Sequence, residues 1–289
     1  KIYHLNSAIG KDFINKNEKK YLSDSIQIPV ASRNLNNKSA LTNTDINFKR
    51  TNHRGLGFDE INKLREKNFI LIKRKKINEK FKKSDFKKAN IGVLVTGRMK
   101  SSRLQKKALK KIGNLSSIEL CLLNCKKIKK ANKVVLATSY LNEDKILVDK
   151  LKKKFDVIAG HPDDVIKRFC QAAKKFKLDI VVRVTGDCPF VSPEIIDFLI
   201  EKHFAKGADY TAAKNISVGT SGEVYNVSSL NFILKKIKCA PFSEYMPWYF
   251  LNNNEYFNIN IVDLPKDLIR PYRLTLDYNE DLIMINKLV

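Results

Sequence analysis

The sequence predicts an α/β protein whose main part, residues 89–289, folds around a mostly parallel sheet. Short apolar runs rich in β-branched residues recur along this part, and they are too short for helices. Segments of helical length separate these runs, which is typical of βαβ units with helices on both faces of the sheet. The preceding residues lack this alternation and carry Asn, Asp and Ser turns, so they predict a small β-rich unit.

The expected elements follow in order along the chain. After a polar approach segment at 1–24, the β-rich unit (25–88) has expected strands at 27–31, 46–50 and 69–72 and a helix at 58–66. The α/β part has expected strands at 91–95, 134–138, 156–159 and 180–184, and helices at 114–130, 162–176 and 193–204. Ligands of such sheets bind beyond the carboxyl ends of the strands. The loops after these strands are therefore the first candidates for a site.

The composition suits a folded protein and argues against several classes. Hydrophobic residues make up 43% of the 289 residues, but no apolar run reaches the roughly 18–20 residues of a membrane span, and no signal peptide is visible. The cysteines are Cys121, Cys125, Cys170, Cys188 and Cys239. Their odd number and the absence of CxxC spacing argue against disulfides and a zinc site, so we expect a cytoplasmic protein. Because the chain begins at Lys1, we also expect an upstream part.

The net charge of +25 raises nucleic acid or another polyanion as an alternative partner. However, the chain has 44 Lys and only 11 Arg, and the excess charge divides evenly between residues 1–90 and 91–289. Base and phosphate readers are usually Arg, because the guanidinium binds in bidentate fashion. The pattern therefore favours a lysine-rich surface over a nucleic-acid binding stripe, and we expect neither nucleic acid nor membrane as a partner.

A basic loop follows the first strand of the α/β part. Residues 97–107 carry two Arg, three Lys and two Ser, followed by the expected start of a helix. Such a loop can hold phosphate through guanidinium groups and helix-terminal amides. It lacks the GxxxxGK[ST] and GxGxxG patterns of common nucleotide sites. On composition alone, an ordinary basic loop remains an equal alternative.

Two aspartates complete the candidate site. Asp187 follows the strand at 180–184 in the turn Thr-Gly-Asp-Cys-Pro, and Asp277 ends the strand-like run 273–277. Alone, each would more often be a helix cap. Together with a phosphate-binding loop, two carboxylates can hold Mg²⁺ against a nucleotide's phosphates. The combination predicts nucleotidyl transfer, in which cations stabilise the leaving pyrophosphate.

Residues 91–289 resemble the cytidylyltransferase family typified by the spore-coat polysaccharide protein SpsF, which is related to the CMP-sugar synthetases of acidic sugars. The resemblance is carried by Arg98-Met99, Ser101 to Leu104, Lys107, Ala137 to Ser139, His161 to Val165, Arg168, Arg183 to Pro189, Gly207 to Tyr210 and Leu274 to Asp277. The resemblance implies a nucleotide-diphospho-sugar transferase (Rossmann-like) fold. It also implies attack of a sugar oxygen on the α-phosphorus of CTP, with release of pyrophosphate, in surface polysaccharide biosynthesis.

The resemblance also implies roles for individual residues. Nucleotide binding would fall to Arg98, Ser101, Arg103, Lys107, Thr138 and Arg183, and catalysis to Arg98, Lys107 and Asp187. Asp187 and Asp277 would bind Mg²⁺, and Glu223 would contact the sugar. The implied partners are CTP and an acidic sugar of the nonulosonic or sialic-acid class.

Several positions depart from the family pattern. Lys100 and Lys106 stand where the family's phosphate loop has glycines, and Gln105 replaces its proline. Long side chains at these positions either block the approach of a phosphate or point outward. Ser221 replaces a family Asp, and Tyr245 a family His. A catalytically impaired module that binds sugar or assembles with a synthase is therefore the alternative function.

Residues 25–88 resemble the SAF (antifreeze-like) β-clip domain found at the C-terminus of NeuB-type sialic acid synthases. The residues that carry the resemblance are Ile28 to Ser32, Leu35 to Leu41, Thr44 to Arg50, Gly55 to Gly57, Asn68 to Ile72 and Ser84 to Phe86. In such synthases an Arg at the place of Arg50 reaches the sugar in a neighbouring subunit, so the resemblance implies a homo-oligomer and a role for Arg50 in substrate binding. An upstream synthase barrel would complete a fused enzyme.

Overall fold

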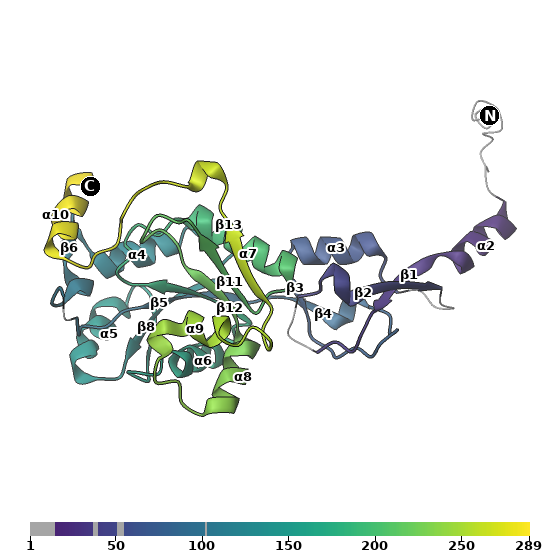
Figure 1. Ribbon diagram of the computed structural model, residues 1–289, viewed down its shortest axis with the longest axis horizontal. Coiled ribbons are helices and arrows are strands. Elements are labelled where there is room, and N and C mark those ends of the chain that lie inside the picture. Colours follow the sequence, from purple (N-terminus) through teal and green to yellow (C-terminus); the bar gives the residue numbers. More distant parts are fainter. Residues whose placement is uncertain (1–14, 37–39, 51–54, 102) are drawn as a thin grey trace.

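The computed structural model describes residues 15–36, 40–50, 55–101 and 103–289 (Figure 1). A seven-stranded sheet with the order β13-β11-β12-β10-β5-β8-β9 forms the centre of the α/β part. Its strands are β5 (Ile91–Thr96), β8 (Lys133–Ser139), β9 (Asp156–Gly160), β10 (Ile180–Thr185), β11 (Tyr210–Lys214), β12 (Glu223–Asn226) and β13 (Ile259–Asp263). Only β12 runs antiparallel to its neighbours β10 and β11. The predicted mostly parallel sheet and its four expected strands are therefore confirmed.

Helices cover both faces of this sheet (Figure 1). One face packs against α4 (Ser117–Cys125), α5 (Lys145–Leu151) and α7 (Pro193–Lys206). The other face packs against α6 (Val165–Phe176), α8 (Val227–Ile237) and α9 (Met246–Leu251). Because both faces are buried, β5 and β10 are apolar along almost their whole length instead of alternating.

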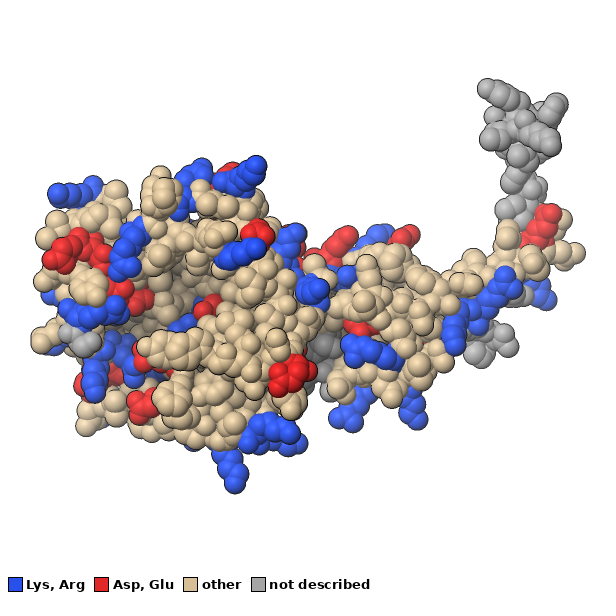
Figure 2. All heavy atoms as spheres, in the orientation of Figure 1, with Lys and Arg blue, Asp and Glu red and all other residues tan. Residues whose placement is uncertain are grey.

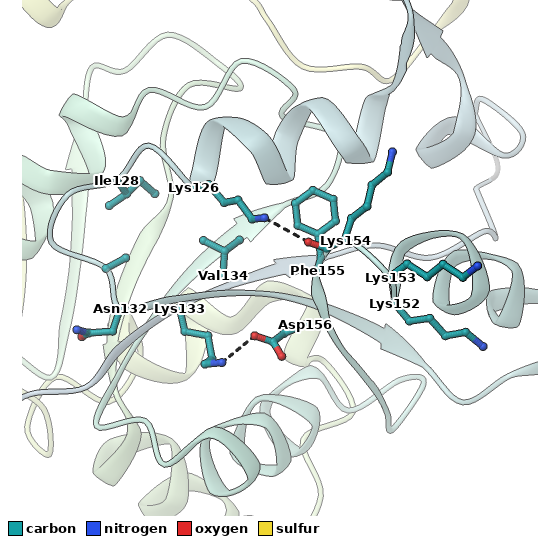
Figure 3. Close-up of a pocket in the computed structure, with 11 residues that line it drawn as sticks. Lys126, Ile128, Asn132, Lys133, Val134, Lys152, Lys153, Lys154, Phe155 and Asp156 are labelled. Atoms are coloured by element: carbon teal, nitrogen blue, oxygen red, sulfur yellow. Dashed lines mark hydrogen bonds and ion pairs between the residues drawn. The ribbon is translucent and has the colours of Figure 1, made fainter.

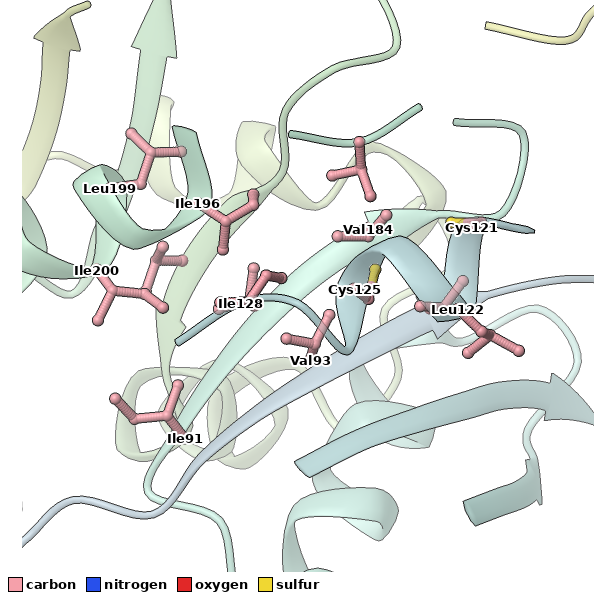
Figure 4. Close-up of a cluster of buried hydrophobic side chains, with 14 of the residues drawn as sticks. Ile91, Val93, Cys121, Leu122, Cys125, Ile128, Val184, Ile196, Leu199 and Ile200 are labelled. Atoms are coloured by element: carbon pink, nitrogen blue, oxygen red, sulfur yellow. The ribbon is translucent and has the colours of Figure 1, made fainter. Parts of the chain in front are cut away.

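The larger core cluster shows how the first strand is held. Ile91 and Val93 of β5 belong to the same buried cluster as Cys125 of α4 and Ile196 of α7 (Figure 4). All four side chains are almost completely removed from solvent. Burying aliphatic side chains of this size stabilises a fold by about 1.5–3 kcal/mol each. The cluster therefore fixes the strand whose carboxyl end carries the basic loop.

Two helix predictions were wrong in extent. The expected helix at 114–130 is only α4, because residues 111–116 form a hairpin of β6 (Lys111–Ile112) and β7 (Leu115–Ser116). Gly113 supports its turn with a φ of +55°. The helix expected at 162–176 begins at Val165, where the side chain of Asp164 accepts a hydrogen bond from the backbone N–H of Lys167. The helix expected at 193–204 is α7.

The N-terminal unit contains the expected short strands. A hairpin of β1 (Gln27–Ala31) and β2 (Ile46–Arg50) and one of β3 (Phe69–Leu71) and β4 (Phe86–Lys88) accompany α3 (Phe58–Glu66). The short 3-10 helices η1 (Asn43–Asp45) and η2 (Lys83–Asp85) precede β2 and β4. The unit has its own apolar cluster, and an ion pair joins Lys87 to Asp179 of the α/β part. The approach segment is partly helical, as α2 (Lys16–Ser25), and residues 1–14 lie outside the described part.

The surface agrees with a dispersed positive charge. Figure 2 shows Lys and Arg scattered over one face of both units, interspersed with Asp and Glu. Within the described residues, no helix combines the length and apolarity needed to cross a membrane.

Candidate active site

A pocket of about 490 Å³ lies at the carboxyl ends of β5 and β10. Its lining includes Arg98, Ser101, Arg103, Lys107, Arg183 and Asp187 of the predicted site residues. The sheet order explains why they meet, because β5 and β10 are parallel neighbours and their last residues, Thr96 and Thr185, are paired. Loops that follow adjacent parallel strands emerge at the same edge of a sheet.

Lys107 lies between the two predicted metal ligands. Its Nζ is 2.6 Å from Oδ2 of Asp187 and 3.2 Å from Oδ1 of Asp277. Burial alone would raise the pKa of Asp187, but the nearby Lys107 outweighs it and holds the pKa below its usual value. Burial likewise opposes the charge of Lys107, yet Asp187 and Asp277 keep its pKa above the ordinary lysine value. Asp187 and Lys107 are therefore both charged at neutral pH.

Backbone pairing, and not a strand of the sheet, brings Asp277 to Asp187. The expected strand at 273–277 is absent, and this segment forms one isolated parallel bridge, from Arg273 to Val218. The backbone N–H of Leu276 donates to the carbonyl of Asp187 at 2.8 Å. Gly219, with a φ of +93°, permits this close approach, because a Cβ there would lie 2.5 Å from the backbone nitrogen of Thr275.

Further charged groups hold Asp277 in place. Nη2 of Arg103 lies 2.9 Å from Oδ1 of Asp277, and Nη2 of Arg273 lies 3.1 Å from its Oδ2. The side chain of Asp281, at the start of α10 (Asn279–Leu288), accepts the backbone N–H of Asp277 at 2.8 Å. Asp277 thus has a cation on each carboxylate oxygen, which preorganises it for ligand binding.

The basic loop is anchored at its start, and its described residues form no α-helix. The backbone N–H of Met99 donates to Oδ1 of Asp144 at 2.6 Å, and Ser139 at the end of β8 donates to the other oxygen of that carboxylate. The expected helix start is only the 3-10 helix η3 (Lys107–Leu109), so no helix N-terminus faces the pocket from this loop. Side chains, and not helix-terminal amides, supply its positive charge.

Arg98 and Arg183 form a second group of arginines at the pocket. The acidic residues Glu223 and Glu244 bind them. Nη1 of Arg183 lies 2.7 Å from Glu223, and its Nη2 donates to the carbonyl of Glu244 at 3.0 Å. Arg98 donates to the carbonyl of Pro162 at 3.2 Å and lies 3.6 Å from the carboxylate of Glu244. Glu223 does not line the pocket. It reaches the pocket only through its contact with Arg183.

Four predicted site residues are absent from the pocket lining. Asp277 and Glu223 contact Lys107 and Arg183 there, whereas Thr138 and Arg50 lie elsewhere. Thr138 is completely buried near the end of β8, and its hydroxyl has no hydrogen-bond partner in the described part of the chain. Arg50 ends β2 in the N-terminal unit and is exposed. Their predicted roles stay predictions.

The predicted site residues did not include Asp144, Arg168, Glu244, Arg273 or Asp281. Of these, Arg168 and Glu244 line the pocket, Asp144 binds Met99 of the basic loop, and Arg273 and Asp281 bind Asp277. The sequence already marked Arg168, because it belongs to the family resemblance, and Arg273 and Asp281 each lie four residues from Asp277. Asp144 and Glu244 reach the site through tertiary contacts that leave no signal in residue spacing.

The two lysines that replace family glycines differ in position. Lys100 is exposed at the pocket lining. Lys106 is also exposed but does not line the pocket, and its φ of +53° is left-handed. Its side chain therefore points outward and leaves the pocket open, while its backbone keeps the conformation that glycine favours.

The stability of variants at Lys106 should depend on how well the new residue tolerates a left-handed backbone. Lys106→Gly removes strain but loosens the unfolded chain, so the free energy of unfolding should change by less than about 1 kcal/mol. Lys106→Val places a β-branched side chain at positive φ and should cost about 1–2 kcal/mol. Urea unfolding of both variants measures the difference, and equal stability of the Val and Gly variants would contradict the assignment.

Cys188 beside Asp187 is not a nucleophile. Burial, followed by the charge of Asp187, raises the pKa of this thiol to about 12. A neutral, 7%-exposed thiol that packs against Thr185 fills space instead of attacking substrate.

A second pocket of about 470 Å³ lies at the opposite, amino ends of β8 and β9 (Figure 3). Five lysines line it, but internal contacts already engage most of them. Lys126 donates to the carbonyl of Lys154, and Lys133 forms an ion pair with Asp156. The pocket offers neither paired carboxylates nor buried free cations, so it is a poorer candidate for chemistry.

Comparison with known proteins identifies the family. Residues 92–280 match the family model of the cytidylyltransferases. The spore coat polysaccharide biosynthesis protein SpsF of Bacillus subtilis is 31% identical over 196 residues, which are 65% of this chain and 81% of SpsF. A solved cytidylyltransferase from Leptospira borgpetersenii is 30% identical with a TM-score of 0.61, covering 67% of this chain and 83% of its own.

A shorter match extends to an enzyme whose name states its sugar. The 3-deoxy-manno-octulosonate cytidylyltransferase of Chlorobium phaeobacteroides is 31% identical over 114 residues, which are 39% of this chain and 46% of that enzyme. The family model alone spans more than half of the chain, and it contains Arg98, Lys107, Asp187 and Asp277. This chain therefore belongs to the cytidylyltransferase family.

Proposed function

We propose that the chain transfers CMP from CTP to an acidic sugar of the nonulosonic class and releases pyrophosphate, in surface polysaccharide biosynthesis. The observation that carries the proposal is Lys107 between Asp187 and Asp277, 2.6 Å and 3.2 Å from their carboxylates, in a pocket lined with Arg. Negative charge that develops on the leaving pyrophosphate needs such cations.

The paired aspartates fit Mg²⁺. In the described residues no cluster of three or more His, Cys, Asp or Glu could hold a metal by itself, and Mg²⁺ at nucleotide sites is bound by one or two carboxylates together with substrate phosphates. Asp187 and Asp277 converge on one cation, Nζ of Lys107, and both offer only oxygen. We propose that they would hold Mg²⁺, which would neutralise charge at the α-phosphate when bound.

The chain's own residues would orient the reaction. A hydroxyl oxygen of the sugar forms a bond to the α-phosphorus of CTP and loses its proton to solvent, and the bond from that phosphorus to the bridging oxygen of the β-phosphate breaks. The electron pair leaves with pyrophosphate, close to Lys107, Arg98 and Arg103. Ser101 also lines the pocket and can donate its hydroxyl to a phosphate oxygen.

The acidic sugar is inferred from an arginine that lines the pocket. Arg183 is held by Glu223 and faces the same pocket, which places a guanidinium where a sugar carboxylate can bind. The relative from Chlorobium phaeobacteroides carries an acidic sugar in its name.

We further propose that the N-terminal unit is a SAF domain and that Arg50 acts on the sugar of a neighbouring subunit in a homo-oligomeric, fused synthase. Its two hairpins support this proposal, because each follows the same order of a 3-10 helix and then a strand. Each 3-10 helix ends in an aspartate, Asp45 or Asp85, that accepts the backbone N–H three residues earlier. In the alternative function, the chain has lost activity and binds sugar only.

Pyrophosphate release tests the proposal. Purified protein is given CTP and Mg²⁺ with each of a panel of nonulosonic acids, and released pyrophosphate is measured. We expect release that depends on one class of acidic sugar and disappears without Mg²⁺. No release with any acid, while the folded protein still binds one of them, would favour the sugar-binding alternative and reject the transferase.

A further inference from the structure

A single buried arginine stands out on the pocket wall. Arg168 lies in the first turns of α6, and only 1% of its surface is exposed, yet it lines the pocket. Its stem packs over Gly160 at the end of β9, where a Cβ would lie 2.8 Å from Cγ of Arg168. The position therefore allows this side chain only because residue 160 is glycine.

The guanidinium of Arg168 lacks the partners that a structural arginine has. Its Nε and one Nη are buried and have no hydrogen-bond partner within the described chain, and no carboxylate of a described residue lies within ion-pair distance of it. The three acids whose charges act on Arg168 are otherwise engaged: Asp144 binds Met99 and Ser139, and Asp163 and Glu244 lie against Arg98. Buried polar groups are nearly always hydrogen-bonded, so two free donors on one buried cation require an explanation.

Without a ligand, the unpaired charge of Arg168 on the pocket wall destabilises the folded protein. Burial, followed by the charge of the nearby Arg98, lowers the pKa of Arg168 to about 10. The group nevertheless remains protonated at neutral pH, and a buried, unpaired charge destabilises the folded protein. An anion between Arg98 and Arg168 would satisfy the free donors and offset the repulsion between the two cations.

We propose that Arg168, together with Arg98, is the receptor for an oxyanion of the substrates, bound through the fork of the Arg168 guanidinium. The chemistry is shared by two groups that the proposed function brings to the pocket, a phosphate of CTP and the carboxylate of the acidic sugar. The identity of the oxyanion rests on that proposed function, whereas the receptor itself rests on the buried free donors. Lys107 and Arg103 are occupied at the aspartates, so this receptor is a separate anchor within the pocket.

Stability and binding should change in opposite directions when Arg168 is neutralised. Thermal unfolding of Arg168→Gln without ligand should occur at the wild-type temperature or above it, because a buried unpaired charge is removed. Its affinity for the bound oxyanion should fall by about tenfold or more, as expected for loss of charge-assisted hydrogen bonds. Arg168→Lys should recover part of the affinity. Arg74→Gln, at an exposed arginine of the N-terminal unit, is the matched control and should change neither quantity.

Calorimetric titrations identify the source of the oxyanion. Pyrophosphate, CTP, CMP and an acidic sugar are each titrated into wild-type protein and the variants. Weaker binding of pyrophosphate and CTP in Arg168→Gln would assign a phosphate, and weaker binding of the sugar alone would assign the carboxylate. Unchanged affinities for all four ligands, or a lower unfolding temperature with unchanged affinities, would overturn the proposal. Binding through Arg168 in a protein that releases no pyrophosphate would instead contradict the proposed reaction and leave this receptor standing.

Discussion

Asp187→Asn should reduce pyrophosphate release by at least about 10²-fold while the protein stays folded. The substitution keeps the shape of the side chain but removes the charge that faces Lys107 at 2.6 Å. It also removes one of the two carboxylates proposed to hold Mg²⁺, and losing a single preorganised electrostatic group typically costs an enzyme about 10²–10³-fold. Steady-state kinetics over a range of Mg²⁺ concentrations measure the loss.

A matched control separates the site from general charge effects. Asp149 is an exposed aspartate of α5 whose partner is Lys152 of the next turn, and Asp149→Asn should leave turnover unchanged. Circular dichroism and thermal unfolding show whether both variants are folded. Near wild-type turnover of folded Asp187→Asn would remove Asp187 from the catalytic site.

Lys107→Met should lose both turnover and stability, and Mg²⁺ should restore only the stability. Without the ammonium, Asp187 faces Asp277 with no cation between them, although Arg103 and Arg273 still contact Asp277. Leaving the carboxylate of Asp187 without its cation should lower the free energy of unfolding at neutral pH by about 2 kcal/mol. Turnover should fall by about 10²-fold or more, since Mg²⁺ does not replace the cation beside the leaving group.

The same ion pair predicts how the stability difference between Lys107→Met and the wild type changes with pH. In the wild-type protein the pKa of Asp187 is lowered, so its contribution is present above the unfolded pKa of about 3.9 and is lost as pH falls through the folded value. In Lys107→Met no ammonium outweighs the burial that raises the pKa of Asp187. Acidification should therefore protonate Asp187 and relieve its repulsion with Asp277. Urea unfolding should therefore show that the difference in the free energy of unfolding between variant and wild type becomes smaller from neutral pH toward pH ~5. A constant gap, or none, would contradict the ion-pair account.

The apolar strands were predictable because their pattern is local. The runs that begin at Ile91 and Ile180 are buried on both faces, and such continuous apolar runs identify central parallel strands. The antiparallel β12 and the edge strand β13 escaped prediction, since the alternation of partly exposed residues in Ile259–Asp263 is weak. The false strand at 273–277 has apolar residues at strand spacing, but its backbone pairs with Val218 and Asp187 instead of joining the sheet.

The site residues on loops that directly follow a strand were predictable from the sequence. Asp187 and Lys107 fall on loops after neighbouring parallel strands, so the topology alone brings them together. Glu244 reaches the site from a distant segment through Arg183 and Arg98, and no spacing rule predicts it. Arg168 was visible in the sequence, but the absence of partners that gives it meaning is a property of the folded pocket.

Phosphorus NMR of the complete reaction tests the central proposal most directly. With CTP, Mg²⁺ and the active acidic sugar, the account predicts that the three phosphate signals of CTP are replaced by pyrophosphate and one new phosphodiester signal, which correlates with the sugar. Neither product should form with Asp187→Ala. Appearance of CMP or CDP with no sugar phosphodiester, at the same rate with and without the acid, would show hydrolysis and contradict cytidylyl transfer to an acidic sugar.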